Sequence, residues 1–340
     1  MEPVELLAKL TARCDLTRDE ARGLFDAIMN GRVAEPLLAA LLSALATKGE
    51  TVAEIVGAAE AMRARVTPVR VPAGVEAIDT CSTGGDGRPT FNISTTVAIV
   101  AAAAGATVAK HGNRSHVRPS GSAEGLAALG INVDAPVPVL EQCLRECRIA
   151  FLFAPNLHPA MRHAAPVRKS LGIRTIFNLV GPLTNPARVR RQLLGVNRPE
   201  LMETMIAALR ALGTERALVV HGAPGLCDLS LDGPSHAARW DGRRVTVEDV
   251  DVRVVGGEPA PIDTLFVRSP QESAAVIAQV LAGQPGPARD IVVFNAAAAL
   301  WVAGVAKDWA EGGRVAREAI DSGAARETLA RWRTLSRGPG

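Results

Sequence analysis

The sequence is 340 residues long and carries a formal net charge of +3 at pH 7, which is enough chain for about two domains. Hydrophobic residues make up 48% of it and charged residues 21%, as in globular proteins with a buried core. Aromatic residues make up only 3%, and no stretch is densely basic. A nucleic-acid partner is therefore not expected, because such surfaces combine clustered Lys and Arg with aromatic stacking platforms. A small anionic ligand needs only a few local positive groups.

The five cysteines have irregular spacings, which fit neither a disulfide framework nor a paired-cysteine zinc site. Cys143 and Cys147 would lie one turn apart on a helix as buried thiols. We therefore expect a protein of the reducing cytoplasm. Residues 1–10 lack a basic-then-apolar signal pattern. The longest apolar stretch, 97–109, is too short to span a bilayer, so no membrane partner is expected.

Residues 1–70 carry helix signals and no strand signal. The segments 17–20 and 51–54 each have a threonine followed three residues later by a glutamate, which is the capping box of a helix start. The apolar segment 36–47 suits a buried helix, with a proline in its first position, where the missing N–H is tolerated. We predict a small helical domain over 1–70, with a linker across 67–76.

The pattern changes after residue 75, where short apolar runs alternate with helical stretches. The predicted strands are 77–80, 107–109, 149–153, 193–196 and 217–220. The predicted helices include 94–104, 138–147, 200–212, 270–281 and 296–305. Such alternation is typical of an α/β domain with a mostly parallel central sheet. We place this domain at 75–157 and 187–336.

Three segments do not resemble scaffold: 82–96, 109–123 and 155–186. All are rich in Gly, Pro, Ser, Asn, His and Arg, and the first two directly follow predicted strands. In open α/β sheets, ligands bind at the carboxyl ends of strands. These segments are therefore the candidate active-site loops.

The first of these loops is a candidate anion cradle. Gly84, Gly85 and Gly87 allow the backbone to turn its N–H groups toward a ligand. A helix begins near 92–95, where free N–H groups favour phosphate. An ordinary glycine turn followed by a helix cap is the alternative interpretation. The spacing matches neither a dinucleotide fingerprint nor a nucleotide P-loop.

The second loop places three basic or ionisable groups, Lys110, His111 and Arg114, around a glycine directly after a strand. Lys110 could neutralise a phosphate, and a solvated loop is the alternative. A third basic stretch contains Arg162, Arg168 and Lys169. By itself that stretch is equally well explained as a solvated helix face.

The chain resembles the anthranilate phosphoribosyltransferase family in the motifs STGGDG, FNIST, AKHGNRS, SGSAEGLAALG, FLFAP, HPAMRHAAPVRKSLGIRTIFNLVGPLTNPA and ALVVHG. Their order and spacing match over nearly the whole chain, and the segment 158–187 is the most specific. The resemblance implies a small helical domain, joined by helices from about 158–186, beside a larger α/β domain. It also implies a homodimer formed through the helical domains.

The activity implied by this resemblance is transfer of a 5-phosphoribosyl group from phosphoribosyl pyrophosphate to the amine of anthranilate, a step of tryptophan biosynthesis, with Mg²⁺ as cofactor. The residues implied for the donor are Ser82, Gly84, Gly85, Asp86, Thr90, Asn92, Ser94, Thr95, Lys110 and Ser122. Those implied for the acceptor are Ser82, His111, Asn113, His158, Arg168 and Pro182. Those implied for the chemistry are His111, Asn113 and Arg168, and those for metal are Ser94, Asp228 and Cys227.

Two of these assignments have a structural alternative. A planar guanidinium such as that of Arg168 suits a bidentate contact with a carboxylate, and the family match favours this over a solvated helix face. His111 is the best candidate for orienting the amine, but it could instead hydrogen-bond the loop around it. No catalytic base is nominated, because an aromatic amine is already neutral at pH 7 and positioning alone lowers much of the barrier.

The sequence departs from the family pattern at the substrate site. Cys227 and Asp228 stand where the family has an Asp-Glu pair that binds magnesium. Magnesium prefers hard oxygen ligands, so Cys227 is a poor substitute, while Asp228 can still bind one ion. Leu157 precedes His158, where an aromatic residue is common in the family.

A further departure lies in the loop 116–119, where the family has a serine-rich stretch with a Lys or Arg. Here Val117 and Pro119 remove polar groups that would face the donor, and Arg118 could compensate from a shifted position.

Two alternatives to anthranilate transfer therefore stay open. One is phosphoribosyl transfer to a different aromatic acceptor in a specialised pathway. The other is a catalytically silent binding or regulatory relative of the enzymes. Retention of the segment 84–86, Lys110 and Arg168 counts against a silent site, and the absence of a basic stripe counts against one that binds nucleic acid.

Overall fold

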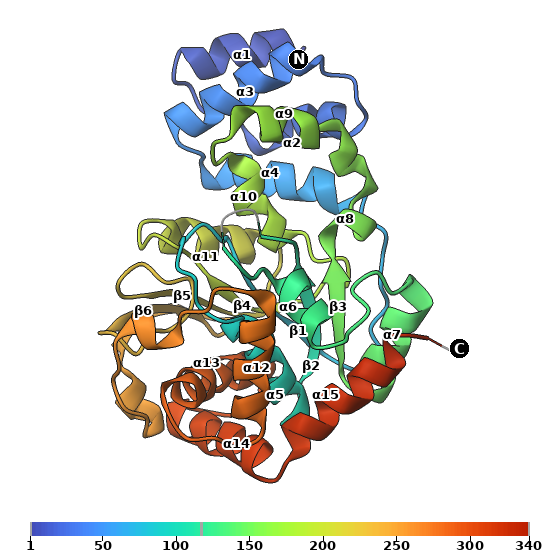
Figure 1. Cartoon of the computed structure of the whole chain (residues 1–340). Helices are drawn as coiled ribbons and strands as arrows, with labels where there is room; N and C mark the ends of the chain where they lie inside the picture. Colours follow the sequence, from blue (N-terminus) through green and yellow to red (C-terminus); the bar gives the residue numbers. More distant parts are fainter. Residues whose placement is uncertain (1, 116–117, 339–340) are drawn as a thin grey trace.

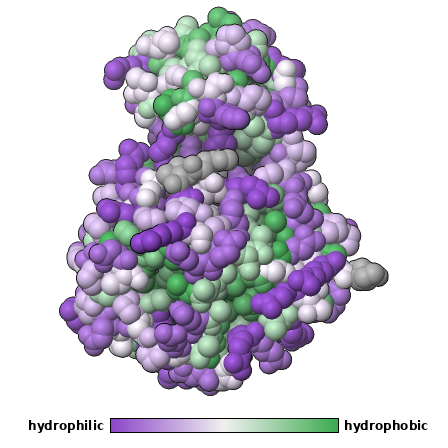
Figure 2. All heavy atoms as spheres, viewed as in Figure 1, coloured by the Kyte–Doolittle hydropathy of each residue, from purple (hydrophilic) through white to green (hydrophobic). Residues whose placement is uncertain are grey.

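The computed structural model describes residues 2–115 and 118–338 and consists of two lobes. A small all-helical lobe lies on a larger α/β lobe that contains the sheet (Figure 1). The molecule narrows to a waist between the lobes (Figure 2). This arrangement confirms the predicted fold class, a helical N-terminal domain with a mostly parallel α/β domain.

The helical lobe begins with four helices whose starts follow the sequence signals. They are α1 (Pro3–Thr11), α2 (Arg18–Met29), α3 (Glu35–Lys48) and α4 (Val52–Arg63). Both predicted capping boxes form, Thr17 with Glu20 and Thr51 with Glu54. α3 begins one residue earlier than predicted, at Glu35, so its proline lies in the second helical position.

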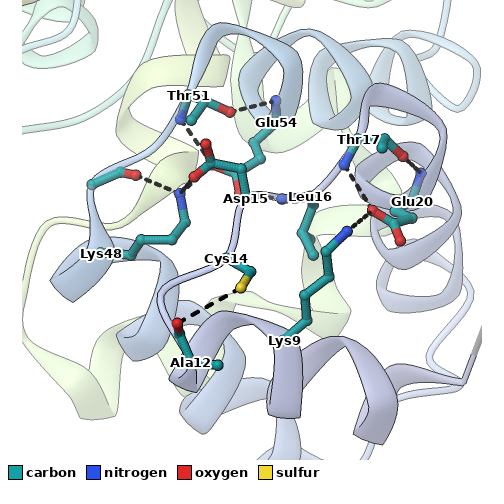
Figure 3. Close-up of polar contacts among 11 residues, drawn as sticks. Lys9, Ala12, Cys14, Asp15, Leu16, Thr17, Glu20, Lys48, Thr51 and Glu54 are labelled. Atoms are coloured by element: carbon teal, nitrogen blue, oxygen red, sulfur yellow. Dashed lines mark hydrogen bonds and ion pairs between the residues drawn. The ribbon is translucent and has the colours of Figure 1, made fainter.

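Glu54 does more than cap a helix (Figure 3). Its side chain is completely buried, and its carboxylate accepts hydrogen bonds from the backbone N–H groups of Leu16 (2.9 Å) and Thr51 (2.8 Å). Lys48 Nζ lies 3.0 Å from the same carboxylate and 2.7 Å from Asp15. A buried carboxylate needs such partners, so Glu54 joins the α1–α2 connection to the start of α4.

A second group of short helices follows β3 and joins the helical lobe. It comprises α8 (Ala154–Leu157), η1 (Pro159–His163), α9 (Ala165–Leu171), α10 (Ile176–Val180) and η2 (Gly181–Leu183). α9 and α10 both contact α3, and α10 also contacts α4. Phe177 of α10 packs edge-on against Phe25 of α2, with ring centroids 5.5 Å apart. The chain segment that carries Arg168 therefore belongs to the helical core.

The larger lobe is built on one seven-stranded sheet with the order β3-β2-β1-β4-β5-β6-β7. The strands are β1 (Ala77–Ser82), β2 (Thr107–Gly112), β3 (Ile149–Phe153), β4 (Arg191–Gly195), β5 (Arg216–Gly222), β6 (Ser235–Trp240) and β7 (Val245–Val250). The first five pair in parallel, whereas β6 and β7 pair antiparallel. The five predicted strands are confirmed, and the antiparallel pair was not predicted.

Helices cover both faces of the sheet. They are α5 (Ile93–Ala103), α6 (Ser122–Ala128), α7 (Val137–Glu146), α11 (Leu201–Ala211), η3 (Val252–Val255), η4 (Ile262–Leu265), α12 (Pro270–Leu281), α13 (Pro287–Ala303), α14 (Trp309–Asp321) and α15 (Ala324–Leu335). α5 and α13 contact the central strands on one face. α11 packs on the opposite face and contacts α4, so the helical core continues onto the sheet.

The predicted helix 296–305 is the second half of α13, which begins at Pro287 and ends before Gly304 in the left-handed conformation (φ 81°). Within the described ranges 2–115 and 118–338, no helix combines the length and apolarity needed to cross a membrane.

The crossing of α2 and α4 depends on Gly57. A Cβ atom there would overlap the backbone oxygen of Arg18, whereas a Cβ at Gly23, on the exposed side of α2, would meet nothing within 4 Å. We expect Gly57→Ala to lower the free energy of unfolding by about 1–3 kcal/mol, as overpacking does. Gly23→Ala is the matched control and should raise it by up to about 1 kcal/mol. Urea-denaturation midpoints measure both, and equal midpoints for Gly57→Ala and wild type would contradict this helix packing.

Candidate functional site

Neighbouring parallel strands bring the predicted loops together at one edge of the sheet. β1 ends at Ser82 and leads into residues 83–87, which we call the glycine loop. β2 ends with the segment 110–112, and Asp228 follows shortly after β5. Because β2, β1, β4 and β5 are consecutive in the sheet, their carboxyl ends converge, as ligand sites of open α/β sheets require.

The glycine loop exposes backbone donors. Gly84, Gly85 and Gly87 have φ values of 63°, 80° and 64°, a region that side-chain-bearing residues rarely adopt. The N–H of Gly84 donates to Ser82 Oγ at 3.3 Å. The N–H groups of Gly85, Asp86 and Gly87 have no hydrogen-bond partner within the described residues. Successive free N–H groups of this kind form an anion-binding nest.

The side chain of Asp86 points away from this nest. It is completely buried, and its carboxylate accepts from Arg118 Nε at 2.8 Å and Nη2 at 2.5 Å. The backbone N–H of Cys227 also donates to it, at 3.3 Å. A bidentate guanidinium–carboxylate pair is among the strongest hydrogen-bonded contacts. Asp86 therefore presents its N–H to a ligand and uses its carboxylate to anchor the loop.

The predicted phosphate-binding residues near the start of α5 differ in whether their side chains are already hydrogen-bonded within the protein. Asn92 is buried, and its amide bonds the backbone and hydroxyl of Ser120 and the hydroxyl of Ser273. Its side chain therefore joins the segment before α6 to helix α12. The hydroxyls of Thr90 and Thr95 are buried and have no partner among the described residues. Ser94 differs from these residues, because its hydroxyl contacts Lys110 and lines a cavity with Asp228.

Lys110 lies at the base of the site. Its Nζ donates to the backbone oxygen of Thr80 at 2.6 Å and to Ser94 Oγ at 3.1 Å. Burial lowers the pKa of Lys110, and the negative charge of Asp79 opposes that shift. Burial raises the pKa of Asp79 to about 6, opposed by hydrogen bonds from Asn185 and from the backbone of His111. This lysine is thus a nearly buried cation held toward the donor side.

Asp228, Cys227 and Ser94 line one small cavity of about 10 Å³, room for a single water molecule. Burial raises the pKa of Asp228 to about 6, and the Arg118 guanidinium opposes this rise. Burial also raises the pKa of the Cys227 thiol well above its usual value, and its sulfur lies 3.8 Å from the oxygen of Gly84. Cys227 thus stays protonated at neutral pH.

Asp228 and Ser94 offer ligands of the kind that Mg²⁺ prefers. The carboxylate of Asp228 and the hydroxyl of Ser94 are hard oxygen donors on the same cavity, and Mg²⁺ is usually held by one or two carboxylates together with substrate phosphates. Among residues 2–115 and 118–338, no group of three or more His, Cys, Asp or Glu side chains is arranged to hold a metal. The set therefore fits an ion shared with a phosphate ligand, and the neutral thiol of Cys227 does not.

His111 and His158, both predicted as acceptor residues, lie in contact. Their Nε2 atoms are 3.1 Å apart and both rings are buried. Burial lowers the pKa of His111 to about 3, helped by the neighbouring His158, and burial lowers the pKa of His158 to about 4. Both imidazoles are therefore neutral at pH 7, with one ring donating to the other. The pair can orient a ligand by hydrogen bonding but carries no charge.

Arg168 and Asn113 complete the predicted acceptor side. The guanidinium carbon of Arg168 lies 5.1 Å from the ring centroid of Phe177, and burial lowers its pKa. Within the described residues its side chain makes no hydrogen bond or ion pair, so its donors are free for a ligand. Asn113 is exposed just after β2, where its Oδ1 accepts from the backbone of Arg114 at 2.7 Å.

The two remaining predicted residues differ in exposure. Pro182 is buried in η2, and its backbone oxygen accepts from Gln192 Nε2 at 2.7 Å. Ser122 is the first residue of α6 and is half-buried.

Two residues that hold the glycine loop were not predicted from the sequence. Arg174 donates to the backbone oxygen of Gly84, and Asn197 donates to that of Gly85. Arg118, which we expected to compensate on the donor side, pairs instead with the carboxylate of Asp86. Each acts on the loop from a distant part of the chain, and no local spacing signals such a contact.

The comparisons with known proteins agree with this geometry. The family models described as "Glycosyl transferase family, a/b domain" and "Glycosyl transferase family, helical bundle domain" match residues 74–326 and 4–66. An anthranilate phosphoribosyltransferase of Desulfatibacillum aliphaticivorans is 48% identical over 94% of this chain and 95% of its own length. The chain belongs to the anthranilate phosphoribosyltransferase family.

Solved structures of this family superpose closely. The enzyme of Thermus thermophilus has a TM-score of 0.92 at 40% identity and covers 98% of this chain and 99% of its own. The enzyme of Saccharomyces cerevisiae in complex with PRPP and Mg has a TM-score of 0.90 at 26% identity, covering 99% and 98%.

Against this family background, the departures seen in the sequence have local structural roles. The sulfur of Cys227 lies 3.8 Å from the oxygen of Gly84, while its backbone N–H, which any residue here would supply, donates to Asp86. Arg118 fills the space beside that carboxylate. Of the altered loop 116–119, residues 116 and 117 lie outside the described residues.

Proposed function

We propose that this member of the anthranilate phosphoribosyltransferase family transfers the 5-phosphoribosyl group of phosphoribosyl pyrophosphate to the amine of anthranilate, releasing pyrophosphate, in tryptophan biosynthesis. The observation that carries the proposal is the row of unpaired N–H groups at Gly85, Asp86 and Gly87 in the described part of the chain, which lies at the same sheet edge as Lys110. It offers a diphosphate fixed donors and a positive charge.

On the donor side, the glycine-loop N–H groups bind diphosphate oxygens and Lys110 lies beneath them. Asp228 and Ser94 would hold Mg²⁺ together with the diphosphate. When bound, the ion neutralises the negative charge that builds on the leaving pyrophosphate. The N–H donors are already oriented before reaction, so they stabilise that charge without reorganising.

On the acceptor side, Arg168 binds the carboxylate of anthranilate in a bidentate contact. The neutral pair His111 and His158 orients the amine through the remaining ring nitrogen of His158, because the two Nε2 atoms bond each other and the His111 ring also bonds the backbone of Gly181. Asn113 lies at the mouth of the path. A neutral imidazole leaves the amine lone pair free, because it donates no proton to it. These residues position the acceptor and do not activate it.

The transfer itself breaks the bond between ribose C1 and the pyrophosphate oxygen, whose electron pair leaves with pyrophosphate. The lone pair of the anthranilate nitrogen forms the new C1–N bond, and one amine proton is lost to solvent. The amine is neutral at pH 7, so holding the two reactants in line supplies much of the rate enhancement.

The enzyme works in the cytoplasm as a homodimer formed through the helical lobe. All five cysteines are free thiols, which supports a reducing compartment.

The first test is turnover of wild-type protein with phosphoribosyl pyrophosphate, Mg²⁺ and anthranilate, followed by loss of anthranilate fluorescence. Arg168→Ala should raise the KM for anthranilate about 10- to 100-fold, because a hydrogen bond to a charged group contributes about 1.5–3 kcal/mol. The KM for the donor should stay unchanged.

Lys169→Ala is the matched control, because Lys169 is the exposed neighbouring cation on the same helix. It should leave both KM values unchanged. Donor binding without turnover of anthranilate would point to a different aromatic acceptor, and binding of neither ligand would favour the silent relative.

Cys227→Asp tests the metal site. A second hard carboxylate beside Asp228 should lower the Mg²⁺ concentration for half-maximal rate by about threefold or more, which corresponds to roughly 0.7 kcal/mol. Initial rates and calorimetric Mg²⁺ titration in the presence of the donor measure this. Cys227→Ser removes the sulfur without adding charge and serves as control. An unchanged metal profile in Cys227→Asp would remove this position from the metal site.

A further inference from the structure

Three side chains from outside the glycine loop contact its carbonyl oxygens: two through nitrogen donors, and Cys227 through a weaker contact of its sulfur, 3.8 Å from the oxygen of Gly84. Arg174 Nη1 donates to the backbone oxygen of Gly84 at 2.9 Å. Asn197 Nδ2 donates to the backbone oxygen of Gly85 at 3.2 Å. Arg174 lies between α9 and α10, and Asn197 follows β4. Two segments far apart in the chain therefore donate hydrogen bonds to consecutive peptide groups of the loop.

The direction of these two carbonyls fixes the direction of the next N–H groups. In a trans peptide the C=O of one residue and the N–H of the next point to opposite sides of the C–N bond within the peptide plane. With the oxygen of Gly84 turned toward Arg174, the N–H of Gly85 turns away from it. With the oxygen of Gly85 turned toward Asn197, the N–H of Asp86 turns away from Asn197. These are the N–H groups left without a partner in the described part of the chain.

Contact with Arg174 also explains why residue 85 lacks a side chain. A Cβ atom at Gly85 would overlap Arg174 Nη1, and Asn197 Nδ2 lies 3.7 Å from the same point. The residue has a φ of 80° as well. The guanidinium therefore lies directly on the loop backbone, where a Cβ would displace it, and the positive φ favours glycine at this position.

Arg174 and Asn197 each keep one polar atom without a hydrogen-bond partner in the described part of the chain. Arg174 Nη2 and Asn197 Oδ1 are both buried and have no partner among residues 2–115 and 118–338. Burial lowers the pKa of Arg174. A buried polar atom without a partner destabilises the folded state. A pair retained at such a cost is better explained by a role in ligand binding than by fold stability alone.

Arg174 further connects the two halves of the site. It lies six positions after Arg168 in the chain, in the segment that packs within the helical lobe. The glycine loop belongs to the α/β lobe. One short segment therefore carries the predicted carboxylate ligand of the acceptor and a direct contact to the donor loop.

We propose that Arg174 and Asn197 are positioning residues. By hydrogen-bonding the carbonyl oxygens of Gly84 and Gly85, they keep the N–H groups of the glycine loop oriented for a diphosphate before it binds. Arg174 in addition links the helical lobe to the donor loop. This rests on the proposed function, since the ligand of the loop is the diphosphate of the donor. Neither side chain needs to touch the donor.

The test is calorimetric binding of phosphoribosyl pyrophosphate, and of inorganic pyrophosphate as a simpler probe, to full-length Arg174→Ala and Asn197→Ala. We expect the donor Kd and KM to rise about 10- to 100-fold for Arg174→Ala and about 3- to 10-fold for Asn197→Ala, in line with hydrogen bonds to charged and neutral groups. The kcat at saturating donor should change less than about threefold, and Arg174→Lys should recover part of the affinity.

Arg198→Gln is the matched control. Arg198 is an exposed cation near Arg174 and makes no hydrogen bond to the glycine loop in the described residues. It should bind the donor like wild type. An equal loss of donor affinity in Arg198→Gln would mean that any positive charge nearby has the same effect, which would overturn the proposal. Wild-type affinity in both Arg174→Ala and Asn197→Ala would also overturn it.

Melting temperatures without ligand separate binding from folding. If Arg174→Ala fails to fold, Arg174→Lys and Asn197→Ala decide the outcome through the same titrations. Failure of the wild-type protein itself to bind the donor would instead refute the proposed function. Normal wild-type binding with unaffected variants would refute only the positioning role.

Discussion

A glycine loop binds an anion only while its carbonyl oxygens are kept away from the ligand, because each peptide presents a partial negative charge on one side and a positive one on the other. Four contacts hold the loop in that orientation here. Arg174 and Asn197 hold two carbonyls, and the Asp86 carboxylate is held by Arg118 and by the N–H of Cys227. The loop is thereby oriented by residues that come from both lobes of the molecule.

The charges around this loop nearly balance without a ligand. Asp79, Asp86 and Asp228 contribute carboxylates, and Lys110 and Arg118 contribute cations, all at least partly buried. The pKa values of Asp79 and Asp228 are both raised to about 6 by burial. A diphosphate adds further negative charge to this cluster, and a divalent cation beside Asp228 offsets part of that charge. Metal and donor are therefore expected to bind together.

Much of the fold could be predicted from the sequence because its signals are local. The capping boxes at Thr17 and Thr51 and the apolar runs of the parallel strands are confirmed. β6 was missed because it mixes charged and small residues, although the Asp241-Gly242 pair ahead of the β-branched β7 is a hairpin signal. The site was harder, since Asn92 matches a phosphate-binding motif yet bonds Ser120 and Ser273. Such contacts join residues far apart in the chain, which no spacing rule can indicate.

The most direct measurement is a crystal structure of this protein with phosphoribosyl pyrophosphate and Mg²⁺. The geometry predicts diphosphate oxygens within hydrogen-bonding distance of the N–H groups of Gly85 and Asp86, with the ion on Asp228. The carbonyls of Gly84 and Gly85 should remain on Arg174 and Asn197. A donor bound elsewhere, or a loop whose carbonyls have turned toward the diphosphate, would contradict the central role given to this loop.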